Sequence, residues 1–153
     1  MVGTTLARLC PPYATTKGNT MASIHKDIPI EASAHEVWDA VRDFGALHTR
    51  LVPGFVLDTK LDGDVRIVTF ANGTTAREQL VDCDDQRRRL VYAIASERFT
   101  QHSASVQIIA DGEERCRMLW TTDVLPHEVA PYISGQMDKG AAAVQQTFAR
   151  ARV

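Results

Sequence analysis

The chain has 153 residues, of which 44% are hydrophobic and 24% are charged, proportions typical of a soluble globular protein. This length predicts one domain, large enough to bury a core and to leave room for a pocket. The formal net charge of -2 argues against a general nucleic-acid-binding protein and against binding to anionic membranes, since both need a basic surface. No apolar run approaches the roughly 20 residues that span a bilayer, so we expect no membrane insertion.

The three cysteines, Cys10, Cys83 and Cys116, are odd in number and widely spaced, so neither a disulfide framework nor a zinc site is indicated. A reducing compartment, the cytoplasm, fits this pattern best. The chain contains no HExxH, GxSxG, Walker or GxGxxG motif, so a metal site, a serine hydrolase and a nucleotide site have no support. We therefore expect no metal and no cofactor.

The first twenty residues contain no acidic residue, many threonines and the adjacent prolines Pro11 and Pro12. They lack the apolar segment of about 7–15 residues that a signal peptide needs. Met21, followed by Ala-Ser, resembles a second natural start. We interpret residues 1–20 as a disordered N-terminal extension, with a short targeting peptide as the alternative, and residues 21–153 as the folded domain.

Alternating hydrophobic residues predict a strand over residues 23–31, because side chains of a strand point to opposite faces in turn. The next segment changes to a helical period. Ser33 and Glu36 form an S-x-x-E capping box before an apolar stripe, so a helix is expected to begin there. A second short helix or turn is expected at residues 46–51.

After Pro53 the pattern is one of strands separated by Asp-Gly, Asn-Gly and Asp-Asp turns for some seventy residues. Successive strands joined by such turns indicate an antiparallel meander. No helix-period segment interrupts them, which disfavours a parallel α/β sheet. The expected strands cover residues 55–61, 64–71, 74–83, 89–97, 102–110 and 115–125.

A long helix is predicted from about Pro126 to the end of the chain. Apolar residues there recur at spacings of three and four and form a single stripe, composed of Val129, Ile133, Met137, Gly140, Val144, Phe148 and Ala151. At about 1.5 Å per residue this helix can cross a whole sheet. Gly140 lies on the stripe and leaves space under the helix that a collapsed core would fill with leucine.

With this order of elements the chain resembles the helix-grip (SRPBCC) superfamily, which includes START lipid-binding domains, pollen-allergen-like plant proteins and bacterial polyketide cyclase/dehydrase-like proteins. The resemblance runs from about Met21 to Arg150 and is closest to the last group. It is carried by the segments IPIEASAHEVWDAVRDFGALHTRLVPG, GDVRIVTFANGTTAREQLVDCDD, LVYAIASE and MLWTTDVLP.

The resemblance implies an α+β helix-grip fold. In that fold a curved antiparallel seven-stranded sheet wraps around a long C-terminal helix, with two short helices between strands 1 and 2. The space between the sheet and the helix is usually a cavity for a hydrophobic or aromatic small molecule. The alternative is a packed core without a usable pocket.

Glu78 is the main candidate functional residue. If Asn72-Gly73 forms a tight turn, Ile67 opposes Glu78 and Thr69 opposes Ala76, which places Glu78 on the less polar, inner face and Arg66 on the outer face. A buried carboxylate needs a donor or must take up a proton. Glu78 is therefore a candidate for ligand orientation or for general acid/base catalysis. The alternative places it near the rim, paired with a surface arginine.

Other candidate ligand-binding residues follow from the same alternation, which places Met118, Trp120 and Tyr92 on the inner face. Aromatic residues with one polar atom suit pockets for aromatic or lipid-like ligands, although they are also ordinary core residues. His48 and His102 can titrate near neutrality, and His102 is a second candidate catalytic residue. The remaining candidates are Phe55, Tyr132, Ile133, Met137 and Gly140.

The leading functional hypothesis is a module that binds a hydrophobic small molecule, lipid-like or polyketide-like. The alternative is a polyketide cyclase/dehydratase-type enzyme, in which Glu78 or a histidine moves a proton on a substrate positioned by Trp120 and Tyr92. A second polar group converging on Glu78 would favour the enzyme. A third hypothesis is an assembly partner that uses its surface. The sequence also leaves a homodimer open.

Overall fold

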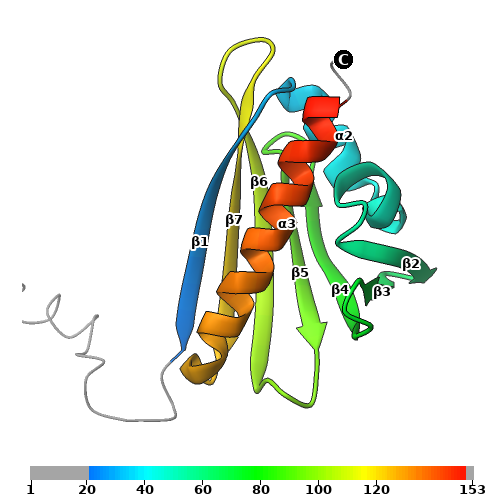
Figure 1. The fold of residues 1–153 in the computed structure, drawn as a ribbon, viewed down its shortest axis with the longest axis vertical. Coiled ribbons are helices and arrows are strands. Elements are labelled where there is room, and N and C mark those ends of the chain that lie inside the picture. The colour runs from blue at the N-terminus through cyan, green and yellow to red at the C-terminus, as the bar shows by residue number, and fades with distance from the viewer. Residues whose placement is uncertain (1–20, 151–153) are drawn as a thin grey trace, which may run out of the picture.

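A computed structural model describes residues 21–150. The extension expected at residues 1–20, and Ala151 of the expected helical stripe, lie outside the described residues. One antiparallel sheet of seven strands, in the order β1-β7-β6-β5-β4-β3-β2, lies behind a long C-terminal helix (Figure 1). The strands are β1 (Ala22–Ile30), β2 (Val56–Asp62), β3 (Val65–Phe70), β4 (Thr75–Asp84), β5 (Arg89–Ala95), β6 (Gln101–Ala110) and β7 (Cys116–Leu125).

Helical segments occupy the β1–β2 connection and the C-terminal end. They are α2 (Ala34–Arg42), the short helices η2 (Phe44–Ala46), η3 (Leu47–Leu51) and η4 (His127–Val129), and α3 (Ala130–Arg150). Helix α2 begins at the predicted capping box, where the Ser33 hydroxyl accepts a hydrogen bond from the Glu36 backbone N at 3.1 Å. The same hydroxyl lies 3.3 Å from the Glu36 carboxylate.

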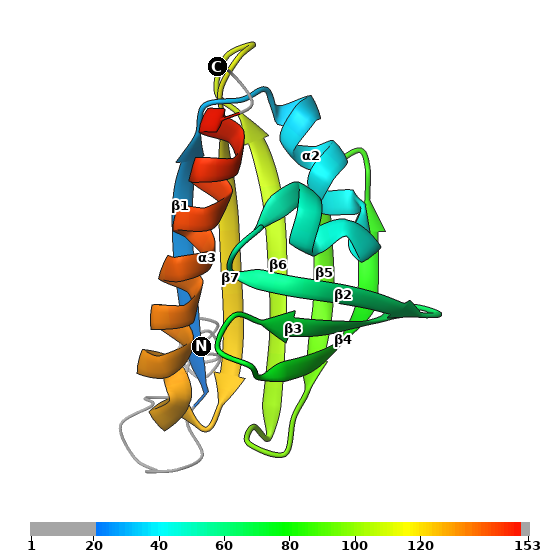
Figure 2. The same ribbon diagram turned by 45° about the vertical axis from the view of Figure 1, so that its right-hand side comes forward.

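The sheet is strongly curved. Two register irregularities, between Val56 and Asp58 in β2 and between Leu80 and Asp82 in β4, bend these strands and increase their twist. Figure 2 shows the result: β2 and β3 run across the molecule, whereas β6 and β7 run along it. The structure therefore confirms the α+β helix-grip fold, with short helices between the first two strands and a sheet that curves around α3.

The register of the β3–β4 hairpin differs from the prediction by one residue. Arg66, not Ile67, lies opposite Glu78, and Val68 lies opposite Ala76. The reason is a three-residue loop, because Phe70 N donates to Thr74 O and Gly73 adopts a positive φ of 89°. A shift of one residue turns the other face of a strand inward, so Arg66 lies on the inner face of β3.

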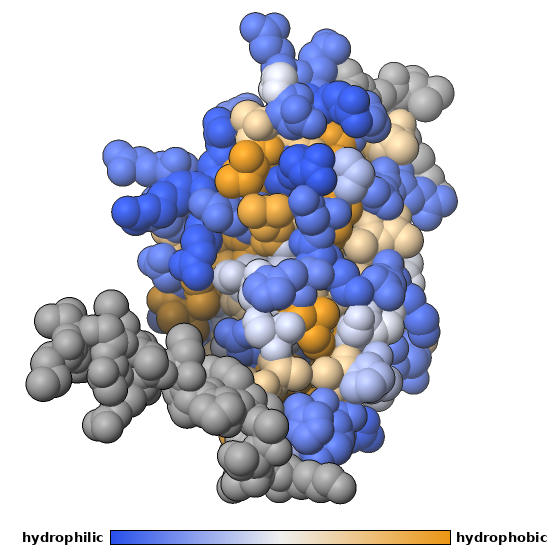
Figure 3. Space-filling model, turned by 90° about the vertical axis from the view of Figure 1, so that its left-hand side faces the viewer, coloured by the Kyte–Doolittle hydropathy of each residue, from blue (hydrophilic) through white to orange (hydrophobic). Residues whose placement is uncertain are grey.

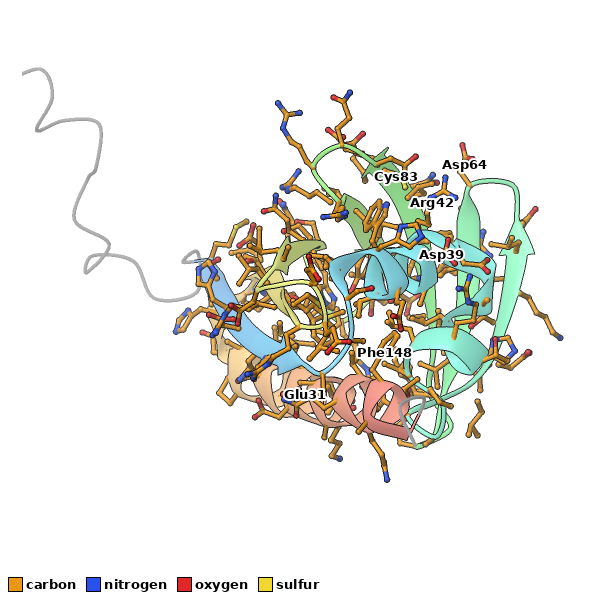
Figure 4. All side chains as sticks on the ribbon, turned by 90° about the horizontal axis from the view of Figure 1, so that it is seen from above. Glu31, Asp39, Arg42, Asp64, Cys83 and Phe148 are labelled. Carbon is orange, nitrogen blue, oxygen red and sulfur yellow. The ribbon has the colours of Figure 1, made fainter. Side chains whose placement is uncertain are left out.

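The buried side chains form two hydrophobic clusters. The larger one lies between the sheet, α2 and the C-terminal half of α3, and it includes Val144 and Phe148. Figure 4 shows Phe148 on the side of α3 that faces the rest of the molecule. The smaller cluster has three buried residues, Val124, Ile133 and Met137, and it belongs to the N-terminal half of α3. Trp120 packs against both clusters.

Polar contacts also hold α3 on β1. Lys26 Nζ lies 2.9 Å from Ser134 Oγ and 2.8 Å from Asp138 Oδ1. Further along the helix, Gln145 Nε2 donates to the Pro29 carbonyl at 3.0 Å. The surface on the β1 side is mostly hydrophilic, and separate hydrophobic areas lie among the hydrophilic residues (Figure 3). No helix within residues 21–150 combines the length and the hydrophobicity needed to cross a membrane.

Candidate functional site

A cavity of about 480 Å³ lies between the inner face of the sheet and α3. Most of its wall consists of aliphatic and aromatic side chains from β2 to β7, η3 and α3. Some lining residues are exposed, among them Thr74 in the β3–β4 connection and Ser96 and Arg98 between β5 and β6. The cavity therefore opens to solvent where these two connections lie beside the N-terminal half of α3.

A buried ion pair forms part of the wall. Arg66 Nε donates to Glu78 Oε1 at 2.7 Å, and the two side chains are only 6% and 8% exposed. The guanidinium also stacks on the Phe44 ring, with Cζ 4.0 Å from the ring centroid, and it lies 5.1 Å from the centroid of the Tyr92 ring. These contacts neutralise the carboxylate and fix the guanidinium, so Glu78 has the donor that a buried carboxylate needs.

Tyr92 and Trp120 form a second polar pair beside the first. Trp120 Nε1 donates to the Tyr92 hydroxyl at 3.3 Å. Burial raises the pKa of Tyr92 well above its usual range, and the negative charge of Glu78 raises it further. Tyr92 is therefore a neutral phenol. The described residues provide no acceptor for its hydroxyl hydrogen and no donor for Glu78 Oε2, so both atoms remain available to a ligand.

His102 lies in the same row of the sheet as the ion pair. Glu78 pairs with Ile94, and Ala93 pairs with Ser103, so His102 follows Ile94 on the next strand. Two strand spacings separate Glu78 from His102, about 10 Å, so the two candidate catalytic residues cannot bond each other directly. Burial lowers the pKa of His102 to about 4, and its buried Nδ1 has no hydrogen-bond partner among the described residues. At neutral pH its imidazole is uncharged.

The cavity brings together most of the residues that the sequence singled out. The lining includes Phe55, Glu78, Tyr92, His102, Met118, Trp120, Tyr132, Ile133 and Met137. Tyr132 is 47% exposed and stands at the opening. Their roles in binding or catalysis remain predictions.

Two of the predicted residues, His48 and Gly140, do not line the cavity. His48 is half-buried in η3, and its Nδ1 lacks a partner among the described residues. Gly140 lies beside the Trp120 ring: a Cβ built on it would be 3.0 Å from two ring atoms of Trp120. The space that the sequence predicted beneath Gly140 is thus filled by an indole ring.

Arg66 is the residue that the sequence analysis missed. Its strand carries apolar residues on both faces, Val65 and Ile67 on one and Val68 and Phe70 on the other, so the choice of inner face depended on the assumed turn length. One feature of the strand favoured the face that carries Arg66 as the inner one. Phe70 is the largest apolar residue of the strand, and it shares a face with Arg66.

The fold and the lined cavity define a helix-grip protein with an internal pocket. Residues 21–151 match the model of the family described as polyketide cyclase / dehydrase and lipid transport, and the chain belongs to this family. No curated protein matches the chain. Within the described residues, no group of three or more His, Cys, Asp or Glu side chains could hold a metal ion.

Solved structures with the same fold come from bacteria and plants. XoxI from Bacillus cereus is 24% identical, covers 86% of this chain and 99% of its own, and superposes with a TM-score of 0.76. A point mutant of norcoclaurine synthase from Thalictrum flavum, in complex with a transition state analogue, is 20% identical, with coverages of 90% and 100% and a TM-score of 0.70. At these identities the likeness concerns the fold alone.

A protein from Thermobifida fusca is 27% identical to this chain. It covers 81% of this chain and 87% of its own, with a TM-score of 0.65. The family match over residues 21–151, together with this shared fold, places the chain in the helix-grip superfamily.

Proposed function

We propose that the protein binds a small hydrophobic or aromatic molecule, lipid-like or polyketide-like, in the cavity between the sheet and α3. The observation that carries the proposal is a largely apolar cavity of about 480 Å³ whose wall includes a buried polar group, formed by Arg66, Glu78 and Tyr92. Pockets for small molecules have volumes of about 300–1,000 Å³ and a few fixed polar groups in an apolar wall. The family description, which includes lipid transport, supports the same class of ligand. A cytoplasmic location is part of the proposal.

The polar part of the cavity wall, formed by Arg66, Glu78, Tyr92 and Trp120, favours a neutral ligand with a hydroxyl group. Arg66 is already paired with Glu78, so the pair has no net charge to attract an anion. A carboxylate placed beside it would meet the negative charge of Glu78. A hydroxyl, in contrast, can donate to Glu78 Oε2 and can accept from the Tyr92 hydroxyl.

The test is a fluorescence titration with 2-naphthol and 2-naphthoate, which share the same ring system. We expect the wild-type protein to bind 2-naphthol more tightly. In Glu78→Gln the preference should move toward 2-naphthoate, because Arg66 keeps its charge and loses its anionic partner. Glu113→Gln, in the distant β6–β7 connection, removes the same charge and should leave the preference unchanged. Failure of both compounds to bind, with a solvent-free packed core in a crystal structure, would refute the proposal.

The second candidate function is an enzyme of the cyclase/dehydratase type. It is favoured by the convergence of Arg66 and Tyr92 on Glu78. In that reaction Glu78 would accept a proton through Oε2. The Tyr92 hydroxyl would donate a hydrogen bond to a substrate carbonyl on which negative charge develops. Arg66 would hold the carboxylate in place.

Turnover of a short poly-β-keto thioester distinguishes the two functions. An enzyme should release a cyclised or dehydrated product, and Glu78→Gln should abolish turnover while the variant still folds and binds naphthalene ligands. Absence of turnover by a wild-type protein that binds 2-naphthol would support the binding function alone. Circular dichroism on each variant checks the fold.

A further inference from the structure

Trp120 stands between helix α3 and the cavity. Its indole lines the cavity, whereas Gly140, directly behind it, does not. A Cβ at position 140 would lie 3.0 Å from Cζ3 and 3.0 Å from Cη2 of the Trp120 ring, and 3.4 Å from Cε2 of Phe55. Contacts of 3.0 Å are tighter than nine in ten that real Cβ atoms make, so a side chain at residue 140 would require the Trp120 ring to move by a few tenths of an ångström.

We infer that Gly140 sets the depth of the cavity by letting the Trp120 indole lie back against α3, and thereby limits the size of the ligand that fits. The inference rests on the proposed binding function and names the residue that controls its selectivity. Gly140 touches no ligand in this arrangement. It is a positioning residue that acts through Trp120.

The geometry decides which group would move if a side chain were added. The backbone of α3 is held on β1 from both sides of Gly140, by Lys26 with Asp138 and by Gln145 with Pro29. The indole has a hollow on its other side, since it lines the cavity. An added Cβ therefore pushes the ring into the cavity, which shortens the space for a ligand.

The same displacement disturbs the polar wall. Trp120 Nε1 donates to the Tyr92 hydroxyl at 3.3 Å, already a long hydrogen bond. A shift of the ring by a few tenths of an ångström therefore changes the geometry of this hydrogen bond to the Tyr92 hydroxyl. The position of the Trp120 ring thus affects both the size of the ligand that fits and the hydrogen bond to Tyr92.

Gly135 provides a matched control on the same helix. A Cβ added to Gly135 would meet no neighbouring atom within 4 Å, and the residue is exposed. Both glycines gain the same helix propensity on substitution by alanine. Any difference between Gly140→Ala and Gly135→Ala therefore reports the contact with Trp120.

The first measurement needs no ligand. The protein has only two tryptophans, so its ¹H–¹⁵N spectrum has two indole signals. Trp38 Nε1 donates to Asp85 Oδ1 at 2.9 Å, outside the lining of the cavity, and serves as the internal reference. We expect Gly140→Ala to shift the Trp120 indole signal and to leave that of Trp38 in place. Gly135→Ala should shift neither signal.

The second measurement uses neutral phenols with two, three and four fused rings: 2-naphthol, 9-phenanthrol and 1-hydroxypyrene. We expect Gly140→Ala to weaken the largest that the wild-type protein binds by about tenfold or more and to change 2-naphthol much less. Gly135→Ala should bind all three like the wild type. The double variant Gly140→Ala/Trp120→Phe should recover the lost affinity, because the smaller ring leaves room for the added Cβ.

The outcomes separate the inference from the function on which it rests. If the wild-type protein binds none of the phenols, the binding function fails, and the indole signals alone decide whether Gly140 positions Trp120. An unchanged Trp120 signal in Gly140→Ala, or an equal loss of affinity for all three phenols, overturns the inference. If Gly140→Ala fails to fold, the double variant is compared with Trp120→Phe alone. If the two variants prefer the same phenols, the inference is supported. If the double variant binds only smaller phenols than Trp120→Phe does, the inference is contradicted.

Discussion

At the scale of single residues, the pair of Arg66 and Glu78 is the most informative feature of the cavity. Its two charges are almost fully removed from water, and they compensate each other at 2.7 Å. Such a pair adds little net stability compared with apolar residues of similar size, but loss of one partner leaves the other charge buried alone. Stability alone therefore does not explain why the pair is present. Its position in the wall of the cavity is consistent with a role in the proposed site.

Replacing one partner should therefore destabilise the protein strongly. We expect Glu78→Gln to lower the free energy of unfolding by about 3 kcal/mol, because Arg66 remains charged and loses its anionic partner. Urea unfolding followed by circular dichroism measures the change. The double variant Arg66→Met/Glu78→Leu should recover most of the loss. A single variant as stable as the wild type would show that water reaches the pair.

His102 predicts a pH dependence with a definite sign. Burial lowers its pKa from about 6.5 to about 4 in the folded state, so the unfolded chain binds the proton more tightly. Its contribution to stability is complete above pH 6.5 and is lost as the pH falls toward 4. His102→Asn should flatten the stability profile between pH 4 and 6.5, as measured by urea unfolding at several pH values. A profile with an unchanged slope would contradict the lowered pKa.

Surface carboxylates do not obscure the upper part of this window. Asp39 and Asp85 have pKa values held below 3.8, the first mainly by its hydrogen bond with Arg50 and the second mainly by that with Trp38. Their contributions begin to be lost as the unfolded groups take up protons near 3.8 and continue to fall through the lower folded values. The slope between about pH 5 and 6.5 therefore reports His102 with little contribution from these two groups.

The sequence predicted the inward position of Glu78 but not its partner. Alternation along β4 is enough to place Glu78, since that strand has one clearly polar face. Which residue of β3 lies opposite Glu78 depends on the length of the β3–β4 loop. One extra loop residue turns the other face of β3 toward the cavity. Asn72-Gly73 is compatible with loops of two or three residues, so local sequence does not decide between them.

At the scale of elements, periodicity was a reliable guide. All seven strands and the long helix lie where the alternation and the helical stripe predicted them, with ends that differ by a few residues. Turn residues and the capping box act locally, so they can be interpreted from a few neighbouring positions. The two register irregularities that curve the sheet left no such local signal.

The capping box gives a test at this scale. We expect Ser33→Ala to lower the free energy of unfolding by about 1 kcal/mol, because the backbone N of Glu36 loses its acceptor at the start of α2. Ser33→Asp keeps an acceptor at the same place and should cost much less. Chemical denaturation of the three proteins measures both effects. Equal losses in the two variants would show that the hydrogen bond is not the cause.

At the scale of the whole molecule, the cavity could be expected from the family resemblance but its shape could not be predicted. The predicted gap beneath Gly140 shows why. Free space depends on which side chain enters it, and here Trp120, from a strand distant in sequence, fills the position. The side chains that close the cavity come from six strands and three helical elements, so its volume is a property of the assembled fold.

Ligand binding should stabilise the whole fold. If 2-naphthol binds the folded state only, a concentration of 100 times its Kd should raise the free energy of unfolding by about 2.7 kcal/mol. Thermal unfolding with and without 2-naphthol measures the effect, and naphthalene-2-sulfonate, with its anionic group, should stabilise less. No increase in Tm at saturating 2-naphthol would mean that binding is not coupled to the folded cavity.

The homodimer that the sequence left open stays a prediction, which sedimentation equilibrium can test.

The division of the core into two clusters has a consequence for the exchange of ligands. The N-terminal half of α3, which borders the cavity opening, packs in the smaller cluster, which has three buried residues, and is also bound by Lys26. The C-terminal half is anchored in the larger cluster. We therefore expect the first half to detach while the second stays folded, as a local unfolding unit. Native-state hydrogen exchange should show less protection, and less dependence on urea, for amides near Met137 than for amides near Val144. Equal protection along α3 would mean that the helix opens only when the whole protein unfolds.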